Sequence, residues 1–153
     1  MAVANIKSEW NGGNLKLGAR SGTPLLALEA VDLQASGQFT EKKTQTALVG
    51  TATVTAAQLL TKVLDGTPVA AATYTLPTAA LLVAALTNSR VGDSFLFVVN
   101  NKSAGANTIT VASGSGGTDD GTMTVAQNVI RAFVIIITNV AAAAEAYFCY
   151  GLG

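Results

Sequence analysis

Two stretches of the chain are apolar on both faces of the strands that they predict, and this limits the folds available. Ser94–Asn100 carries phenylalanine or valine at alternate positions, with Leu96 and Val98 between them. Val129–Thr138 has the same pattern over a longer span, roughly 33 Å at about 3.3 Å per residue. Successive side chains of a strand point to opposite faces. We therefore expect both strands to be central, with each face covered.

The second apolar face needs a cover that a single sandwich does not supply. In an antiparallel sheet of a soluble monomer, one face of each strand meets water and is polar. Two short helices can cover part of the face, and sister copies of the chain are the simplest cover for the remainder. A closed homo-oligomer would also hide the aggregation-prone window Phe133–Ile137. We predict protein contacts at Trp10, Phe133, Ile135 and Ile137.

The two helices are predicted from capping residues and apolar spacing. Thr55 precedes the first, Ala56–Leu64, which Asp65-Gly66 would end. Thr78 precedes the second, Ala79–Leu86. A threonine hydroxyl at such a position accepts a hydrogen bond from a free N–H group of the first turn. The apolar face of the second helix would be formed by Leu81, Leu82, Ala85 and Leu86.

The whole pattern predicts an all-β fold, a mainly antiparallel sandwich or barrel that is jelly-roll-like and carries the two short helices. Ser94–Asn100 and Asn107–Ala112 would form a hairpin. Gln127-Asn128 would be a tight turn between the next two strands. Ser113–Gly121 is predicted to be an exposed, flexible loop. Further strands are predicted at Thr44–Val54, Thr73–Leu76, Thr122–Ala126 and Glu145–Leu152.

Residues 1–39 are predicted to form a small β-hairpin unit, or arm, beside a main domain of residues 40–153. The run Trp10-Asn11-Gly12-Gly13-Asn14 is a turn signal between short strands. A hairpin of this size is marginal alone. We therefore expect it to pack on the main domain or on a neighbouring subunit, with Trp10 as its anchor. Alternatively, Trp10 packs only within its own hairpin. Short strands are predicted at Asn14–Leu17, Pro24–Leu28 and Val31–Leu33.

Charge and length restrict the partners of the chain. Its 153 residues suffice for one hydrophobic core, and they include nine basic and nine acidic side chains. Only 12% of residues are charged, so no basic field exists for nucleic acid. Gly66–Ser89 is uncharged but contains prolines and threonines, so it predicts no membrane helix. The first ten residues lack the apolar segment of a signal peptide. Cys149, the single cysteine, cannot form an internal disulfide and is expected to be buried.

The chain lacks the residues that most enzymes use. It has no histidine, which removes the commonest general base and metal ligand. Nucleotide-binding, nucleophile-elbow and paired-cysteine motifs are missing. Asp119-Asp120 has no further spaced oxygen ligands and predicts a turn rather than a calcium site. Catalysis by two carboxylates that folding brings together remains an open alternative. We predict no catalytic residue, no cofactor and no metal.

Several segments share one further pattern, and they are Ile6–Trp10, Gly13–Leu15, Thr55–Leu60, Thr73–Ala80, Leu86, Val91–Phe95 and Thr138–Val140. Together they resemble a module found in virion proteins of tailed bacteriophages. The resemblance covers most of the chain from Thr55 onward and its first residues, whereas Arg20–Val54 has no counterpart. It specifies that the protein belongs to a virion more closely than it specifies where in the virion the protein lies.

This resemblance implies an all-β, trimeric subunit on the capsid exterior, made in the cytoplasm of the bacterial host. Its partners would be sister copies and the major capsid protein. Its role would be that of a decoration, or cement, protein. The absence of a long repetitive shaft favours cement over a head- or tail-fibre module. A fibre module that binds a host receptor or glycan would need an exposed aromatic platform. The candidates are Trp10, Tyr74, Tyr147 and Tyr150, although the tyrosines fit strand core or rim better.

Overall fold

The computed structural model describes residues 8–11, 14–17, 43–86 and 88–153. The chain divides into two units, Met1–Thr40 and Glu41–Gly153, which are described separately. In the first unit, β1 (Ser8–Asn11) and β2 (Asn14–Leu17) pair antiparallel. These strands match the pair predicted on either side of the Gly12-Gly13 turn.

Other expectations for the first unit lie outside the described residues. They concern the strands predicted at Pro24–Leu28 and Val31–Leu33, and the packing of the Trp10 side chain. That this unit acts as an arm stays a prediction.

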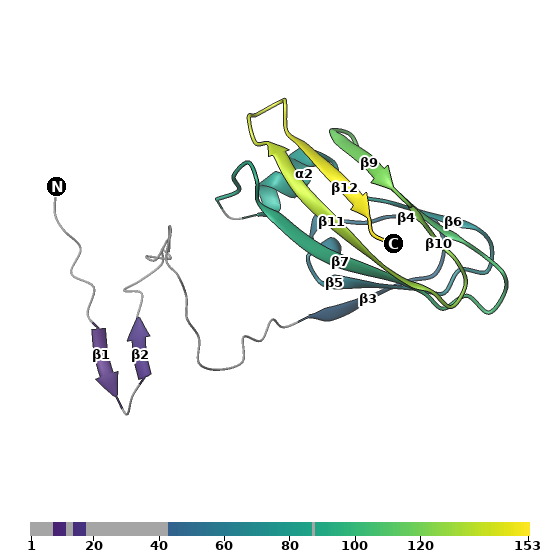
Figure 1. Ribbon diagram of the computed structural model, residues 1–153, viewed down its shortest axis with the longest axis horizontal. Coiled ribbons are helices and arrows are strands. Elements are labelled where there is room, and N and C mark those ends of the chain that lie inside the picture. Colours follow the sequence, from purple (N-terminus) through teal and green to yellow (C-terminus); the bar gives the residue numbers. More distant parts are fainter. Residues whose placement is uncertain (1–7, 12–13, 18–42, 87) are drawn as a thin grey trace. The chain divides into compact units, whose positions relative to one another are not determined.

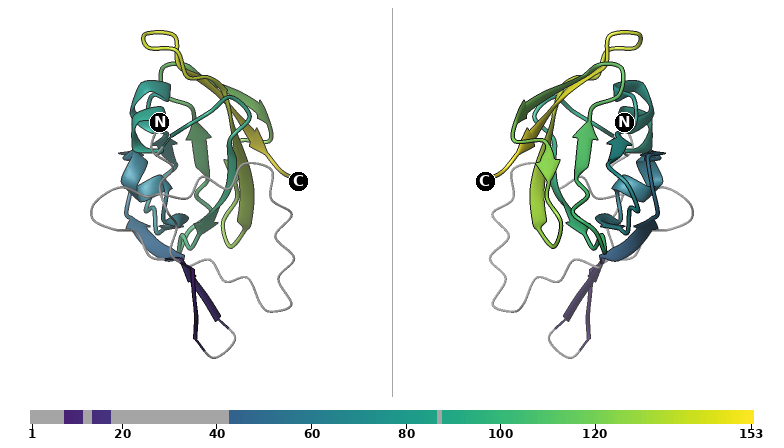
Figure 2. Two further views of the ribbon diagram at one scale, coloured as in Figure 1. Left: turned by 90° about the vertical axis from the view of Figure 1, so that its left-hand side faces the viewer. Right: turned by 90° about the vertical axis from the view of Figure 1, so that its right-hand side faces the viewer.

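The second unit has a six-stranded and a four-stranded sheet in two layers, with two short helices (Figure 1, Figure 2). The all-β class with two short helices agrees with the prediction from sequence. In spatial order the larger sheet contains β3 (Thr44–Leu48), β5 (Lys62–Gly66), β7 (Ser94–Asn101), β11 (Ile130–Asn139), β12 (Ala146–Gly151) and β9 (Gly117–Gly121). The smaller contains β10 (Thr124–Val125), β8 (Ile109–Ala112), β6 (Ala72–Thr75) and β4 (Ala52–Thr53). The helices are α1 (Ala56–Leu59) and α2 (Ala79–Ala85).

The chain alternates between the two sheets from β3 to β11. After each strand the chain returns through the other sheet to the end at which that strand began. For this reason β3, β5 and β7 run parallel, as do β4, β6 and β8. The β9–β12 ladder is also parallel, whereas β7–β11, β11–β12 and β8–β10 are antiparallel. The expectation of a mainly antiparallel, jelly-roll-like sandwich was therefore wrong about strand direction.

The same alternation removes two expected hairpins. Ser94–Asn100 and Asn107–Ala112 contribute to different sheets, and so do the strands on either side of Gln127-Asn128. Ser113–Gly121, expected to be a loop, contains the edge strand β9. Local turn signals mark where the chain reverses, but they do not say which layer the next strand joins.

The first helix is shorter than its sequence predicts. Thr55 is the N-cap, and its hydroxyl accepts from the N–H of Gln58, whose side chain bonds back to the Thr55 N–H. The helix ends at Leu59, and Lys62, with φ 72°, turns the chain into β5. Burial of Leu64 and ladders on both sides of β5 outweigh the weak helical preference of this segment.

The second helix begins as predicted, with the Thr78 hydroxyl accepting from the N–H of Leu81. Its buried residues are Ala79 and Leu82. Leu81 is 61% exposed, so the expectation that it belongs to the apolar stripe was wrong. The helix is only two turns long, and a small rotation about its axis decides which of two adjacent leucines faces the core.

One hydrophobic core fills the space between the sheets. Phe97 of β7 stacks on Phe133 of β11 with ring centroids 5.2 Å apart. Both helices contribute to the same cluster, through Leu59 and Leu82. Cys149 is buried here, as expected, and burial raises the pKa of its thiol to about 12.

Candidate interaction surface

The six-stranded sheet has an apolar side that faces away from the core, which we call the outer face. Burial alternates along β7 and β11, so that every second side chain points outward. Leu96 is 44% exposed, Ile130 64% and Phe148 36%. The apolar members of the outer face are Val63, Leu96, Val98, Ile130, Ala132, Val134, Ile136, Phe148 and Tyr150.

Strand register joins these side chains into continuous rows. Val134 lies between Leu96 of β7 and Tyr150 of β12. Ile136 lies between Ser94 and Phe148 in the next row. The rings of Phe148 and Tyr150 stack with centroids 5.7 Å apart. Because neighbours on one face of a sheet touch across strands, the outer face is one apolar surface rather than scattered side chains.

Polar residues border this surface where β5 and β7 end. Lys102 Nζ lies 2.7 Å from Asp65 Oδ2, and Asn100 Nδ2 donates to Asp65 Oδ1 at 3.0 Å. The hydrogen bond from Lys102 lowers the pKa of Asp65 most; burial opposes the shift, and Asn100 adds to it. The buried carboxylate is thus held ionised by its partners.

Polar residues also border the outer face on its two edge strands. Gln45 of β3 stands opposite Val63, and Asp120 of β9 stands opposite Tyr150. Asp120 and Gln45 are exposed. An apolar centre with a polar rim is the composition of protein interfaces.

The helices do not cover the outer face. We expected that two helices could cover part of the second apolar face of the central strands. Instead, Leu59 of α1 and Leu82 of α2 join the core cluster. The outer face of Glu41–Gly153 therefore keeps exposed apolar side chains.

The structure separates the residues that sequence had proposed for protein contact. Phe133, Ile135 and Ile137 are fully buried between the sheets, where no partner reaches them. The side chain of Trp10 lies outside the described residues. A strand that is apolar on both faces, such as β11, carries no signal for which face is inside. The outward residues, Ile130 and Val134 among them, can be found only from the fold.

Two of the proposed aromatic platform residues are core residues. Tyr74 and Tyr147 are fully buried, and burial raises the pKa of both phenols. The Tyr147 hydroxyl donates to the Pro77 carbonyl at 3.0 Å and accepts from the Gly114 N–H at 3.1 Å. Tyr150 alone of the three tyrosines lies on the outer face, stacked on Phe148.

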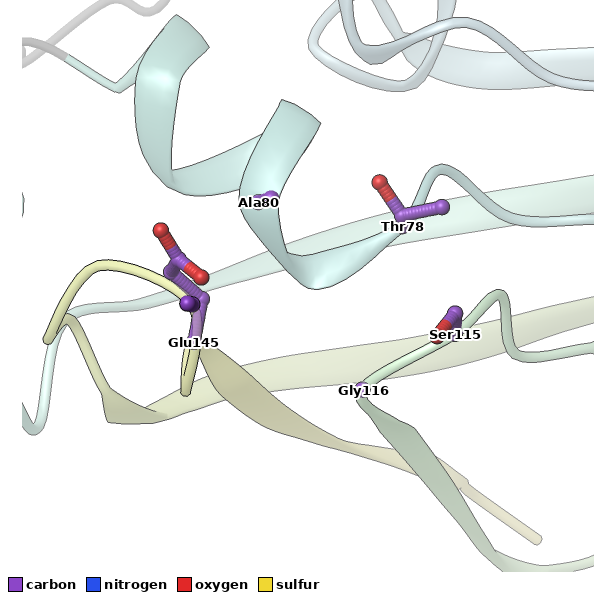
Figure 3. Close-up of a pocket in the computed structure, with 6 residues that line it drawn as sticks. Thr78, Ala80, Ser115, Gly116 and Glu145 are labelled. Carbon is purple, nitrogen blue, oxygen red and sulfur yellow. The ribbon is translucent and has the colours of Figure 1, made fainter.

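A hollow of about 400 Å³ lies where α2 begins beside the loop that leads into β9 (Figure 3). Its polar lining comes from Thr78, Ser115 and Glu145. The Thr78 hydroxyl already caps α2, and the Ser115 carbonyl accepts from the Ala79 N–H at 2.8 Å. These groups hold the helix start against the sheet.

Asp119 accepts from the backbone N–H and hydroxyl of Ser113. Within residues 8–11, 14–17, 43–86 and 88–153, no three acidic or sulfur ligands gather as a metal cluster would require. In this same part of the chain, the helices are too short or too polar to cross a bilayer.

Comparisons with protein-family models, curated proteins and solved structures found no match to this chain. Its function is therefore inferred from its residues and geometry.

Proposed function

We propose that this chain is a capsid decoration, or cement, protein of a tailed bacteriophage. It assembles as a homotrimer and binds the capsid exterior where major capsid subunits meet, after synthesis in the cytoplasm of the bacterial host. The proposal assigns it no catalytic residue, cofactor, metal, nucleic acid or membrane.

The observation that carries the proposal is the open outer face. A contiguous apolar patch of a few hundred Å² on a soluble protein often marks a binding surface. Here the surface lies on a rigid sheet, and the chain has balanced charge. These properties support a passive structural subunit, and the resemblance of several segments to phage virion proteins supports its assignment to a phage virion.

The proposed mechanism is mechanical. Each protomer contributes a modest contact to the shell, and three linked contacts act together because the first raises the effective concentration of the others. The trimer then holds neighbouring capsid subunits against expansion of the shell. Residues 1–39 are the part that we propose reaches a neighbour or the shell.

The direct test is binding to capsids of the encoding phage that were assembled without this chain. Purified protein should co-sediment with them at a stoichiometry that follows capsid symmetry, and bound capsids should release DNA at a higher temperature. Failure to bind intact, expanded capsids would contradict the proposal.

A head- or tail-fibre module is the second candidate, favoured by the stacked pair Phe148 and Tyr150 on the outer face. Exposed aromatic rings are suitable platforms for sugar rings. A glycan array with purified protein separates the two functions. Selective binding that Tyr150→Ala abolishes would favour the fibre, whereas a blank array with capsid binding favours cement.

A further inference from the structure

We propose that the outer face of the six-stranded sheet is the surface through which copies of this chain bind one another. This inference assigns the homotrimer contact of the proposed function to particular residues. It rests on self-association alone and does not require that the oligomer binds a capsid.

The first argument is the distribution of polarity. The apolar rows lie on the three central strands, β7, β11 and β12, whereas the edge strands β3 and β9 present Gln45, Thr118 and Asp120. A face that met only water would be polar at its centre as well. Depletion of charge at the centre with polar residues at the rim is typical of protein interfaces.

The second argument is area. Three strands spaced about 4.8 Å apart, with about 3.3 Å per residue, present roughly 400 Å² of apolar surface. A standard interface buries about 800 Å² on each partner. The central strands therefore supply about half of what a stable complex needs, and the polar border on β3, β5 and β9 can supply the remainder.

The third argument is charge, and it points to a second copy as the occupant. The border at β5 and β7 carries Lys102, which pairs with Asp65 at 2.7 Å and whose ammonium, on a side chain that is 49% exposed, keeps N–H donors for a second carboxylate. The opposite border carries the exposed carboxylate of Asp120 on β9. Around a threefold axis the Lys102 border of one copy meets the Asp120 border of the next, which brings unlike charges together and fixes the orientation of the copies. The nine basic and nine acidic residues leave no net charge to repel an approaching copy.

The shape of the surface is consistent with this occupant. The outer face is a sheet rather than a groove, so three copies can turn this face toward one threefold axis, where each face meets those of its two neighbours. The identical face of a sister copy offers the matching geometry and chemistry, with Leu96, Val134 and Tyr150 in one row on each.

The test compares two double variants of the full chain that add the same charge at exposed apolar positions. Leu96→Lys with Ile130→Lys alters the outer face, where the two residues are 44% and 64% exposed. Val69→Lys with Val91→Lys is the control, at positions 89% and 64% exposed that lie in loops outside the strands. Circular dichroism and thermal unfolding establish that both variants fold.

Sedimentation velocity and light scattering then measure the oligomer. We expect an oligomer for the unchanged chain and the control, and a monomer for the outer-face variant, with a dissociation constant at least about 100-fold higher because lysines would be buried without partners. A monomeric unchanged chain would overturn the inference. An outer-face variant that is still fully oligomeric would overturn it too, while leaving the homotrimer in place.

Oxidative footprinting of the unchanged chain keeps the test decisive if the outer-face variant does not fold. Phe148 and Tyr150 should be protected at high protein concentration and become reactive on dilution to the monomer. Protection that persists in the monomer would mean that another segment of the same chain covers the face, and would refute the proposal. Loss of capsid binding by an intact oligomer would count against the decoration role only.

Discussion

At the residue scale, close backbone approach makes one glycine of β12 indispensable. Gly151 is opposite Gly121 of β9, and the chain beyond β9 passes directly over it. A Cβ atom at Gly151 would meet the backbone O, C and N of Thr122 at distances shorter than van der Waals contact. The backbone atoms of Thr122 cannot move aside as a flexible side chain can.

We expect Gly151→Ala to lower the free energy of unfolding by about 2 kcal/mol, because overpacking typically costs about 1–3 kcal/mol. Urea unfolding measures the change. Gly50→Ala is the matched control, since no atom lies within 4 Å of the Cβ built there. Equal effects of the two substitutions would show that the contact with Thr122 is unimportant.

The Asp65 cluster predicts a pH dependence of stability. Because the folded-state pKa of Asp65 lies below its ordinary value of 3.8, the stabilisation is complete well above pH 3.8 and is lost as the pH falls through the folded pKa. Lys102 is half exposed, so the pair contributes about 0.5–1 kcal/mol. Asp65→Asn should lose that amount at pH 7 and almost none at pH 2.

Urea midpoints from pH 2 to pH 7 check this expectation. Glu145→Gln, which alters a carboxylate in the loop before β12, serves as the control. A constant difference between Asp65→Asn and the unchanged chain across the range would contradict the assigned cause.

At the element scale, the two adjacent leucines of α2 show how packing selects one side of a short helix. Leu82 is fully buried, whereas Leu81 is 61% exposed. Leu82→Ala should lower the free energy of unfolding by about 2–5 kcal/mol, as expected for a cavity in a core. Leu81→Ala should change it by less than about 0.5 kcal/mol. Chemical denaturation of the two variants measures both, and a reversed order would refute the burial assignment.

Short elements were also the least predictable from sequence. Thr55 and Thr78 were recognised as N-caps because capping depends on local hydrogen bonds. The end of α1 was not recognised, because pairing of β5 with β3 and β7 involves residues far along the chain. Helix or strand is decided there by tertiary contacts rather than by propensity.

At the scale of the whole molecule, a surface that binds sister copies links folding to association. The folded oligomer is then favoured at high protein concentration by mass action. We expect the midpoint of thermal unfolding to rise with protein concentration, and the variant Leu96→Lys with Ile130→Lys to lose this dependence. Calorimetry at concentrations differing about 100-fold tests it. A midpoint independent of concentration in the unchanged chain would contradict the linkage.

The sequence by itself determined the all-β class, the central strands β7 and β11, and the two helix starts. These features depend on residue periodicity and local capping, which are visible along the chain. The tertiary structure alone decided that strands alternate between layers, that Phe133, Ile135 and Ile137 face inward, and that no helix of Glu41–Gly153 among the described residues covers the outer face. When a strand is apolar on both faces, its alternating pattern does not tell which face is buried. Only the position of the second sheet then distinguishes core from surface.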